Sequence, residues 1–173
     1  MKRTILTTAL TIGFAAIGLA AQSGLTAEEQ KFVLKAAKTD EAEIALSKLA
    51  LQRSSDPRIK QFAQTMVTDH TKATTMLKPI ATGHNVSIPA SPGPANDAKY
   101  KMLEKKSGKD FDKAYIQTMV VDHQNALQAY QSASGKVQNA ELKGFISKVE
   151  PVVSHHLQMA QQLSQSEKAA KAM

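Results

Sequence analysis

A seven-residue motif that occurs twice constrains the fold of this chain more than any other feature. The first copy is Gln64-Thr65-Met66-Val67-Thr68-Asp69-His70, and the second is Gln117-Thr118-Met119-Val120-Val121-Asp122-His123. Six of the seven positions match across a spacing of 53 residues (117 − 64). Each copy lies in a segment whose apolar residues recur every three to four positions, so its Met and His share one helix face. The chain is therefore predicted to carry the motif on two helices.

Four long segments have the periodicity and the end signals of helices. Thr26 with Glu29 forms a capping box, Asp56 precedes Pro57 as an N-cap, and Asn139 can cap a further helix. These signals predict long helices over about 26–53, 57–83, 109–134 and 140–163. The last residues, 164–173, are rich in Ala, Lys and Ser and are expected to form a frayed tail.

Proline and glycine mark the interruptions. Pro79 should bend the end of the second helix, with Gly83 as its C′ residue, and Pro151 should kink the fourth. The connection between the second and third helices contains three more prolines, and Asn96 is expected to cap a short helix that ends near Lys106.

The lengths of the connections predict how the helices are arranged. The first and last connections are short, so helices one and two, and helices three and four, should form antiparallel hairpins. The middle connection of about 25 residues can travel the length of a bundle, which would make the two motif helices parallel. The sequence therefore predicts an all-α four-helix bundle over 26–163, with a short extra helix in a long crossover and the two motif helices side by side.

The beginning of the chain has the pattern of an export signal. Lys2 and Arg3 precede an apolar stretch from Ile5 to Leu19, and a small-x-small pattern follows. This predicts a signal peptide over 1–20, cut after Ala20 or Ala21. The stretch is short for a transmembrane helix, and the chain has no Cys that could carry a lipid anchor. We expect a periplasmic or secreted protein without a transmembrane anchor after cleavage.

The charge of the chain does not indicate a particular partner. The formal charge is +7, and loss of Lys2 and Arg3 would leave +5 (7 − 2). The lysines are spread over helix faces rather than gathered in a run, so we expect a solvated surface and no nucleic-acid partner. A protein partner in the cell envelope stays open.

Several of these motifs together resemble those of the family called domain of unknown function 4142. They are Glu43 before Leu46-x-x-Leu49-Ala50, Asp56-Pro57, the two Met-Val-x-Asp-His motifs, Phe111-Asp112-x-x-Tyr115, and Pro151 with His156-Leu157. The resemblance covers about Thr26 to Leu163. It implies a ferritin-like bundle and an exported bacterial protein, a group often labelled as outer-membrane proteins, and it implies no settled activity.

The predicted inner faces carry groups that can bind a metal ion. Three faces place a His one turn from a Met, and the fourth carries a carboxylate. The residues are Met66 with His70, Met119 with His123, Met159 with His156, and Glu43. Imidazole and thioether donors suit copper, and the histidines alone also suit zinc. The histidines with Glu43 are the main candidate ligands, and the methionines are weaker ones.

Other carboxylates could support such a site. Asp69 and Asp122 stand about 100° around their helices from the neighbouring histidines, where they could orient the rings or cap a neighbouring helix pair. Glu150 precedes Pro151 and is either a further inner carboxylate or a surface acid at the kink. His155 falls on the polar face and is expected to be solvated.

The same residues also fit a protein that binds no metal. Methionines commonly fill gaps in helix bundles, and inner histidines can hydrogen-bond to carboxylates as a buried polar network. Counted from the hairpins, His156 lies about six residues, roughly 9 Å, beyond the level of His123. Glu43 lies about four residues, roughly 6 Å, from the level of His70. One compact site, two sites or a polar ladder therefore all remain open.

Known catalytic patterns are missing from the sequence. Di-iron bundle enzymes need Glu-x-x-His on two helices, and this pattern does not occur. A phosphate-binding glycine loop, a Gly-x-Ser-x-Gly elbow and a His-Glu-x-x-His motif do not occur either. We therefore expect a binding protein rather than an enzyme: one that buffers or senses copper or zinc, or alternatively a metal-free structural or stress-related protein of the envelope.

Overall fold

The computed structural model describes residues 24–172, and this part of the chain is helical without a strand. The helices are α1 (Ala27–Arg53), α2 (Pro57–Gly83), α3 (Pro94–Glu104), α4 (Gly108–Ser134) and α5 (Ala140–Ala172). The prediction of an all-α chain with four long helices and a short helix in the long connection is confirmed.

The helix starts follow from local capping. The Thr26 hydroxyl accepts from the Glu29 N–H at 3.2 Å, and the Glu29 carboxylate accepts from the Thr26 N–H at 2.8 Å. This is the capping box that the sequence predicts for α1. Asp56 caps α2 ahead of Pro57, and the Asn139 side chain caps α5. These side chains accept from N–H groups that have no partner within the first turn of a helix.

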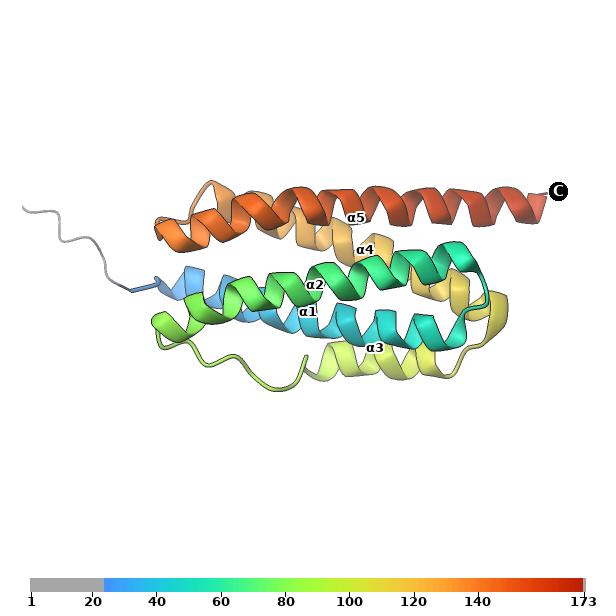
Figure 1. The fold of residues 1–173 in the computed structure, drawn as a ribbon, viewed down its shortest axis with the longest axis horizontal. Coiled ribbons are helices and arrows are strands. Elements are labelled where there is room, and N and C mark those ends of the chain that lie inside the picture. Colours follow the sequence, from blue (N-terminus) through green and yellow to red (C-terminus); the bar gives the residue numbers. More distant parts are fainter. Residues whose placement is uncertain (1–23, 173) are drawn as a thin grey trace, which may run out of the picture.

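The long helices lie side by side along one direction (Figure 1). The colours show that α1 and α2 run in opposite directions, as do α4 and α5, so each pair is an antiparallel hairpin. The segment between α2 and α3 turns back along the bundle, and α3 then runs beside α1 toward the start of α4. As a result α2 and α4 run in the same direction, which is the parallel arrangement expected from the long crossover.

The two motif helices are not neighbours, and the expectation that they lie side by side is wrong. Both α2 and α4 pack against the same two helices, α1 and α5. They therefore face each other diagonally across the core, and side chains from both reach the axis of the bundle. The crossover explains the difference, because α3 and the segment before it occupy the outer surface of α1 and α4.

The end of α2 differs from the expected glycine cap. The helix continues through Pro79 to Gly83, and the left-handed residue is Asn85, with φ 57°. The Val86 N–H donates to the Ala81 carbonyl at 2.8 Å, which closes the last turn. Asparagine tolerates the left-handed region better than most other residues, so it can take the role expected of Gly83.

The short helix begins earlier than expected. Gly93, with φ 92°, is the N-cap of α3, and Pro94 is its first residue. Asn96 was expected to cap this helix but instead lies in its first turn, where its side chain donates to the Pro92 carbonyl. Proline suits the first helical position because its missing N–H would have no partner there.

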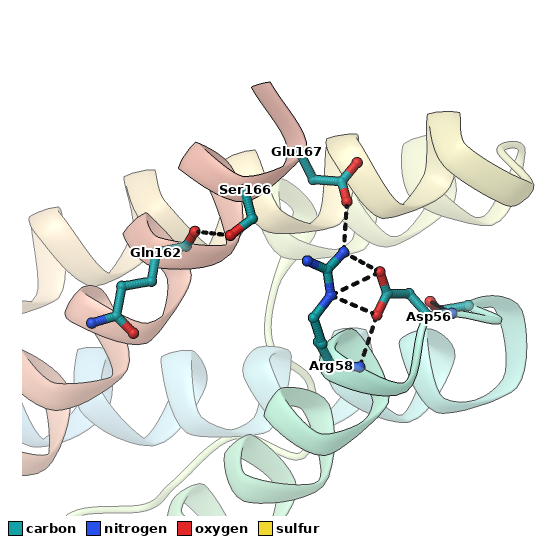
Figure 2. A network of polar contacts seen from close by, with 6 residues as sticks. Asp56, Arg58, Gln162, Ser166 and Glu167 are labelled. Carbon is teal, nitrogen blue, oxygen red and sulfur yellow. Dashed lines mark hydrogen bonds and ion pairs between the residues drawn. The ribbon is translucent and has the colours of Figure 1, made fainter. Parts of the chain in front are cut away.

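Helix α5 continues through Pro151 and past Leu163 to Ala172, where a frayed tail was expected. Its Ala, Lys, Gln and Glu residues favour a helix. The extension also has a tertiary contact, since Arg58 at the start of α2 pairs with Glu167 at 3.4 Å and with Asp56 (Figure 2). Such exposed ion pairs stabilise a fold only weakly, because water and salt screen the charges.

The interior is divided into two apolar clusters. One fills the end of the bundle where α1 begins and includes Leu77, Phe145 and Val149. The other fills the opposite end and includes Phe62 and Tyr115. Buried polar side chains lie between the clusters at mid-length: Asp40, Glu43, Ser47, His70, His123 and His156. The sequence thus builds a bundle whose centre is polar.

The predicted signal peptide over 1–20 lies outside the described residues. Among residues 24–172, no helix combines the length and the apolar character that crossing a membrane requires.

Candidate metal centre

Three histidines from three helices come together among the buried polar residues at mid-length of the bundle, a group that we call the polar layer. His70 of α2, His123 of α4 and His156 of α5 are at most 6 % exposed, and their ring centroids lie 5.4–5.7 Å apart. One nitrogen of each ring lies within 4.8 Å of the corresponding nitrogen of the other two. Of the arrangements left open by the sequence, the structure therefore has the three rings in one compact group.

Each imidazole is held by a hydrogen bond from one nitrogen. His70 Nδ1 donates to Asp40 at 2.8 Å, and His156 Nε2 donates to Asp69 at 3.0 Å. His123 Nδ1 donates to the carbonyl of Met119, one turn earlier, at 2.9 Å. These bonds fix which nitrogen carries the proton in each ring, and they are the kind of outer contact that histidine metal ligands usually make.

The remaining nitrogen of each ring has no hydrogen-bond partner among the described residues. These atoms are Nε2 of His70, Nε2 of His123 and Nδ1 of His156. With the other nitrogen donating, each is an acceptor with a lone pair. Three buried lone pairs without a donor are unfavourable, so the group suits a cation or a proton-donating guest.

A narrow cavity borders two of these rings. It has a volume of about 30 Å³, and its wall includes Asp40, Glu43, His70, His123 and Asp122. This is room for about one water molecule or one ion. Glu43 is outside the group of three rings, but one of its carboxylate oxygens is buried without a partner at this cavity. Burial raises the pKa of Glu43 to about 8, so that its carboxyl is mostly neutral at pH 7.

The histidines differ in how readily they hold a second proton. Burial, followed by the neighbouring His70 and His156, lowers the pKa of His123 to about 3. Burial also lowers the pKa of His156, despite its bond to Asp69. Burial alone would lower the pKa of His70, but the hydrogen bond and the charge of Asp40 outweigh it and raise that pKa. At neutral pH at least two of the three rings are therefore neutral and able to donate a lone pair.

The three methionines all lie on one side of the histidines. Met66 and Met119 are fully buried in the apolar cluster next to the polar layer, and Met159 packs against the same cluster. Met66 and Met119 precede their histidines by four residues, whereas Met159 follows His156 by three. Because α5 runs opposite to α2 and α4, all three methionines fall on the same side of the histidines. The thioethers thus form the apolar boundary of the site on that side.

The other carboxylates singled out in the sequence have different surroundings. Asp69 holds His156, as a ring-orienting carboxylate would. Asp122 pairs instead with Lys99 of α3 at 2.5 Å, so it joins α3 to α4. Glu150 is half-buried and lies two turns before His156 on α5, while His155 is exposed as expected.

Asp40 and Lys99 belong to the site, and the sequence analysis missed both. A signal for Asp40 existed: it lies fifteen residues before the middle of the α1–α2 hairpin at residue 55, and His70 lies fifteen after it. The two are thus level in an antiparallel pair. Lys99 lies on a short helix whose packing could not be deduced from its own pattern.

Comparisons with known proteins identify solved structures with a similar fold and the family of the chain. A search of curated proteins found no match. The chain is similar in structure to a DUF305 fragment from Deinococcus radiodurans, with a TM-score of 0.72, 14 % identity, and coverage of 83 % of this chain and 99 % of that one.

It is also similar to the protein CopM, solved in a Cu(II)-bound form with a TM-score of 0.68 at 17 % identity and in a Cu(I)-bound form with 0.67 at 18 %. Each comparison with CopM covers 79 % of this chain and 95 % of the other. At such identities the likeness concerns the fold. The family assignment comes from the sequence: over residues 15–163 the chain matches, and so belongs to, the family described as domain of unknown function (DUF4142).

Proposed function

We propose that this protein binds a single copper ion at His70, His123 and His156 and thereby buffers or senses copper outside the cytoplasm. The observation that carries the proposal is a compact group of three buried rings, in which one nitrogen of each ring lies within 4.8 Å of one nitrogen of the other two. Each of the three rings also has a buried nitrogen without a hydrogen-bond partner. Three imidazoles, each held by a hydrogen bond from one nitrogen, form a preorganised donor set, and an ion that binds all three must displace any second proton on His70.

The donor set favours copper over most other ions. Imidazole suits copper and zinc, whereas calcium and magnesium prefer oxygen ligands. The rings stand next to a methionine-lined apolar cluster, an environment that suits a soft ion. The likeness in fold to CopM, which was solved with Cu(I), Cu(II) and silver, supports the same choice. Glu43 is the nearest candidate for a fourth ligand or a compensating charge.

The location and the role follow from what surrounds the ion. The predicted signal peptide supports export to the periplasm or the medium, where a protein without cysteine must bind copper through nitrogen or thioether donors. The three rings are buried, and an ion on them would have little contact with a substrate. This favours holding an ion over turnover.

The test is a competition titration of the metal-free mature chain against a coloured chelator, with Cu(I) and with Zn(II). One Cu(I) per chain should bind, and changing all three histidines to Gln should abolish that binding. His155→Gln is the matched control, since this exposed residue neighbours His156 and should leave the affinity unchanged. Absence of copper uptake by the wild-type chain would refute the proposal.

The metal-free alternative has its own support. His70 and His156 are each paired with a carboxylate, so part of the polar layer is satisfied without an ion. In that case the protein would be a structural or stress-related component of the envelope. The wild-type protein discriminates, because a copper site would raise its thermal midpoint when copper is added, whereas a layer that only stabilises the fold would give no copper-dependent shift.

A further inference from the structure

Two hollows adjoin the histidines from the same side of the bundle. The inner one is the 30 Å³ cavity that ends at His70 and His123. The outer one is a groove of about 840 Å³, walled by α1, α4 and the region from Pro92 to Lys99. The two share a wall, formed by Lys35, Thr39, Glu43, Asp122, Ala126 and Ala129. The two hollows therefore adjoin each other at this wall, and the inner one reaches His70 and His123.

Charged side chains are ordered along this path. Lys31, Lys35 and Lys38 line the outer groove. The two carboxylates stand at the shared wall, where Asp122 is paired with Lys99 and one oxygen of Glu43 is buried without a partner. A cation on its way inward would pass Lys31 and Lys38 in the outer groove and then meet Lys35 together with the two carboxylates at the shared wall.

The other sides of the site are more closed. Toward the second apolar cluster, Met66 and Met119 are fully buried. Toward α2 and α5, the Asp69 carboxylate, with a third of its side chain exposed, covers the nitrogen of His156 that carries the proton. The other nitrogen of His156, Nδ1, is buried without a hydrogen-bond partner. Only on the side of α1 and α4 do the hollows described above reach the rings.

We propose that copper enters and leaves through the groove between α1, α3 and α4, and that Lys99 restricts the passage by holding Asp122. This inference rests on the proposed function and adds the route of exchange and the residue that controls it. An ion that passes the wall must exchange water for protein oxygen, and the carboxylates of Glu43 and Asp122 are the ligands in reach. While Lys99 occupies Asp122, that ligand is engaged and its charge is compensated.

Loss of the ion pair between Lys99 and Asp122 should change the rates of copper uptake and release. Lys99 is about a third exposed, so its pair with Asp122 is of the weak, solvent-screened kind. Replacing Lys99 by Gln should speed both uptake and release of copper by about fivefold, the factor that corresponds to such a pair, with the Kd changing less than about threefold. Lys101→Gln is the matched control, because Lys101 is an exposed residue of the same helix and does not line the groove.

The proposed route through the shared wall can be tested by a larger side chain that narrows it. Ala126 lies in the shared wall, and Ala126→Leu adds three carbon atoms there. Both rate constants should fall at least about tenfold, with an unchanged Kd and stoichiometry, since a constriction acts equally on both directions. Ser132→Leu is the matched control, because it adds a leucine to the same helix at an exposed position outside both hollows.

The experiment is stopped-flow transfer of Cu(I) between a coloured chelator and the full mature chain, followed in both directions. Helix content by circular dichroism and the copper stoichiometry at equilibrium verify that each variant is folded and loaded. Slower exchange in Ala126→Leu together with faster exchange in Lys99→Gln would support the route. Wild-type rates in both variants would overturn it and point to the side of Asp69. A wild-type chain that takes up no copper would instead refute the proposed function, so the two failures are distinct.

Discussion

Glu43→Gln should remove a pH dependence from the stability of the metal-free protein. Burial raises the pKa of Glu43 from its ordinary value of 4.5 to about 8. Between these values the folded protein keeps a proton that the unfolded chain has lost. The free energy of unfolding therefore decreases as the pH rises through this window. From pH 6.5 to pH 8 the linkage relation gives a loss of about 2 kcal/mol from this residue alone.

The three histidines also change the stability with pH, and they do so in opposite directions. The stability of the variant must therefore be compared with that of the wild type at each pH. The lowered pKa values of His123 and His156 destabilise the fold as the pH falls below about 6.5. The raised pKa of His70 acts in the opposite sense, because its stabilising contribution is complete below its unfolded value and is lost as the pH rises through the folded one. The histidines are present in both proteins, so their effects cancel in the difference in stability when the sites titrate independently. The difference then reports the titration of Glu43.

The assay is urea unfolding followed by circular dichroism, with a chelator present, at several pH values from 5 to 8. The stability of Glu43→Gln relative to wild type should rise with pH, and between pH 6.5 and pH 8 it should rise by the amount given above. Glu104→Gln, at an exposed position, is the matched control and should give a constant difference. Parallel curves for wild type and Glu43→Gln would refute the reasoning, since they would mean that the buried carboxyl does not hold its proton.

Three further variants test other parts of the structure. Asp40→Asn should weaken copper binding about 10- to 100-fold in the competition titration, because His70 loses its charged partner; an unchanged Kd would contradict this. Ser47→Ala should cost about 1–3 kcal/mol in urea unfolding, because it leaves the buried hydroxyl of Tyr115 unpaired, and the double variant with Tyr115→Phe should cost less than the sum of the single ones. Leu77→Ala should cost about 2–5 kcal/mol by the same assay with copper affinity unchanged, since Leu77 lies in the other apolar cluster from Met66, Met119 and Met159.

The parts of the fold that could be predicted are those with local causes. The capping box of Thr26, Asp56 before Pro57, and the cap at Asn139 each act within one helical turn, and all three are found in the structure. The parallel direction of α2 and α4 follows from the length of the crossover. Their diagonal placement does not, because loop lengths determine the direction of a helix but not which neighbours it packs against.

The position of His156 beside the other two rings was not predicted by counting residues along the helices. By position along the helices it lies about 9 Å from the level of His123. However, side chains on a helix lean toward its N-terminus, and α4 and α5 run in opposite directions. The two imidazoles therefore lean toward each other along the axis, which shortens the gap and brings their ring centroids to 5.4 Å. Axial offsets counted between Cα positions overestimate the separation of long side chains in this geometry.

The diagonal arrangement also bears on how the repeated motif arose. A pseudo-twofold axis along the bundle relates α2 to α4 and α1 to α5, which maps the first hairpin onto the second with its helices in reversed order. Simple tandem copying of one hairpin would relate α1 to α4 instead, so it does not account for the repeat. The symmetry also fails at the aspartates: Asp69 meets a histidine on α5, whereas Asp122 has no histidine opposite it on α1 and pairs with Lys99. The two equivalent aspartates thus have different partners: Asp69 holds the ring of His156, and Asp122 pairs with Lys99 of α3.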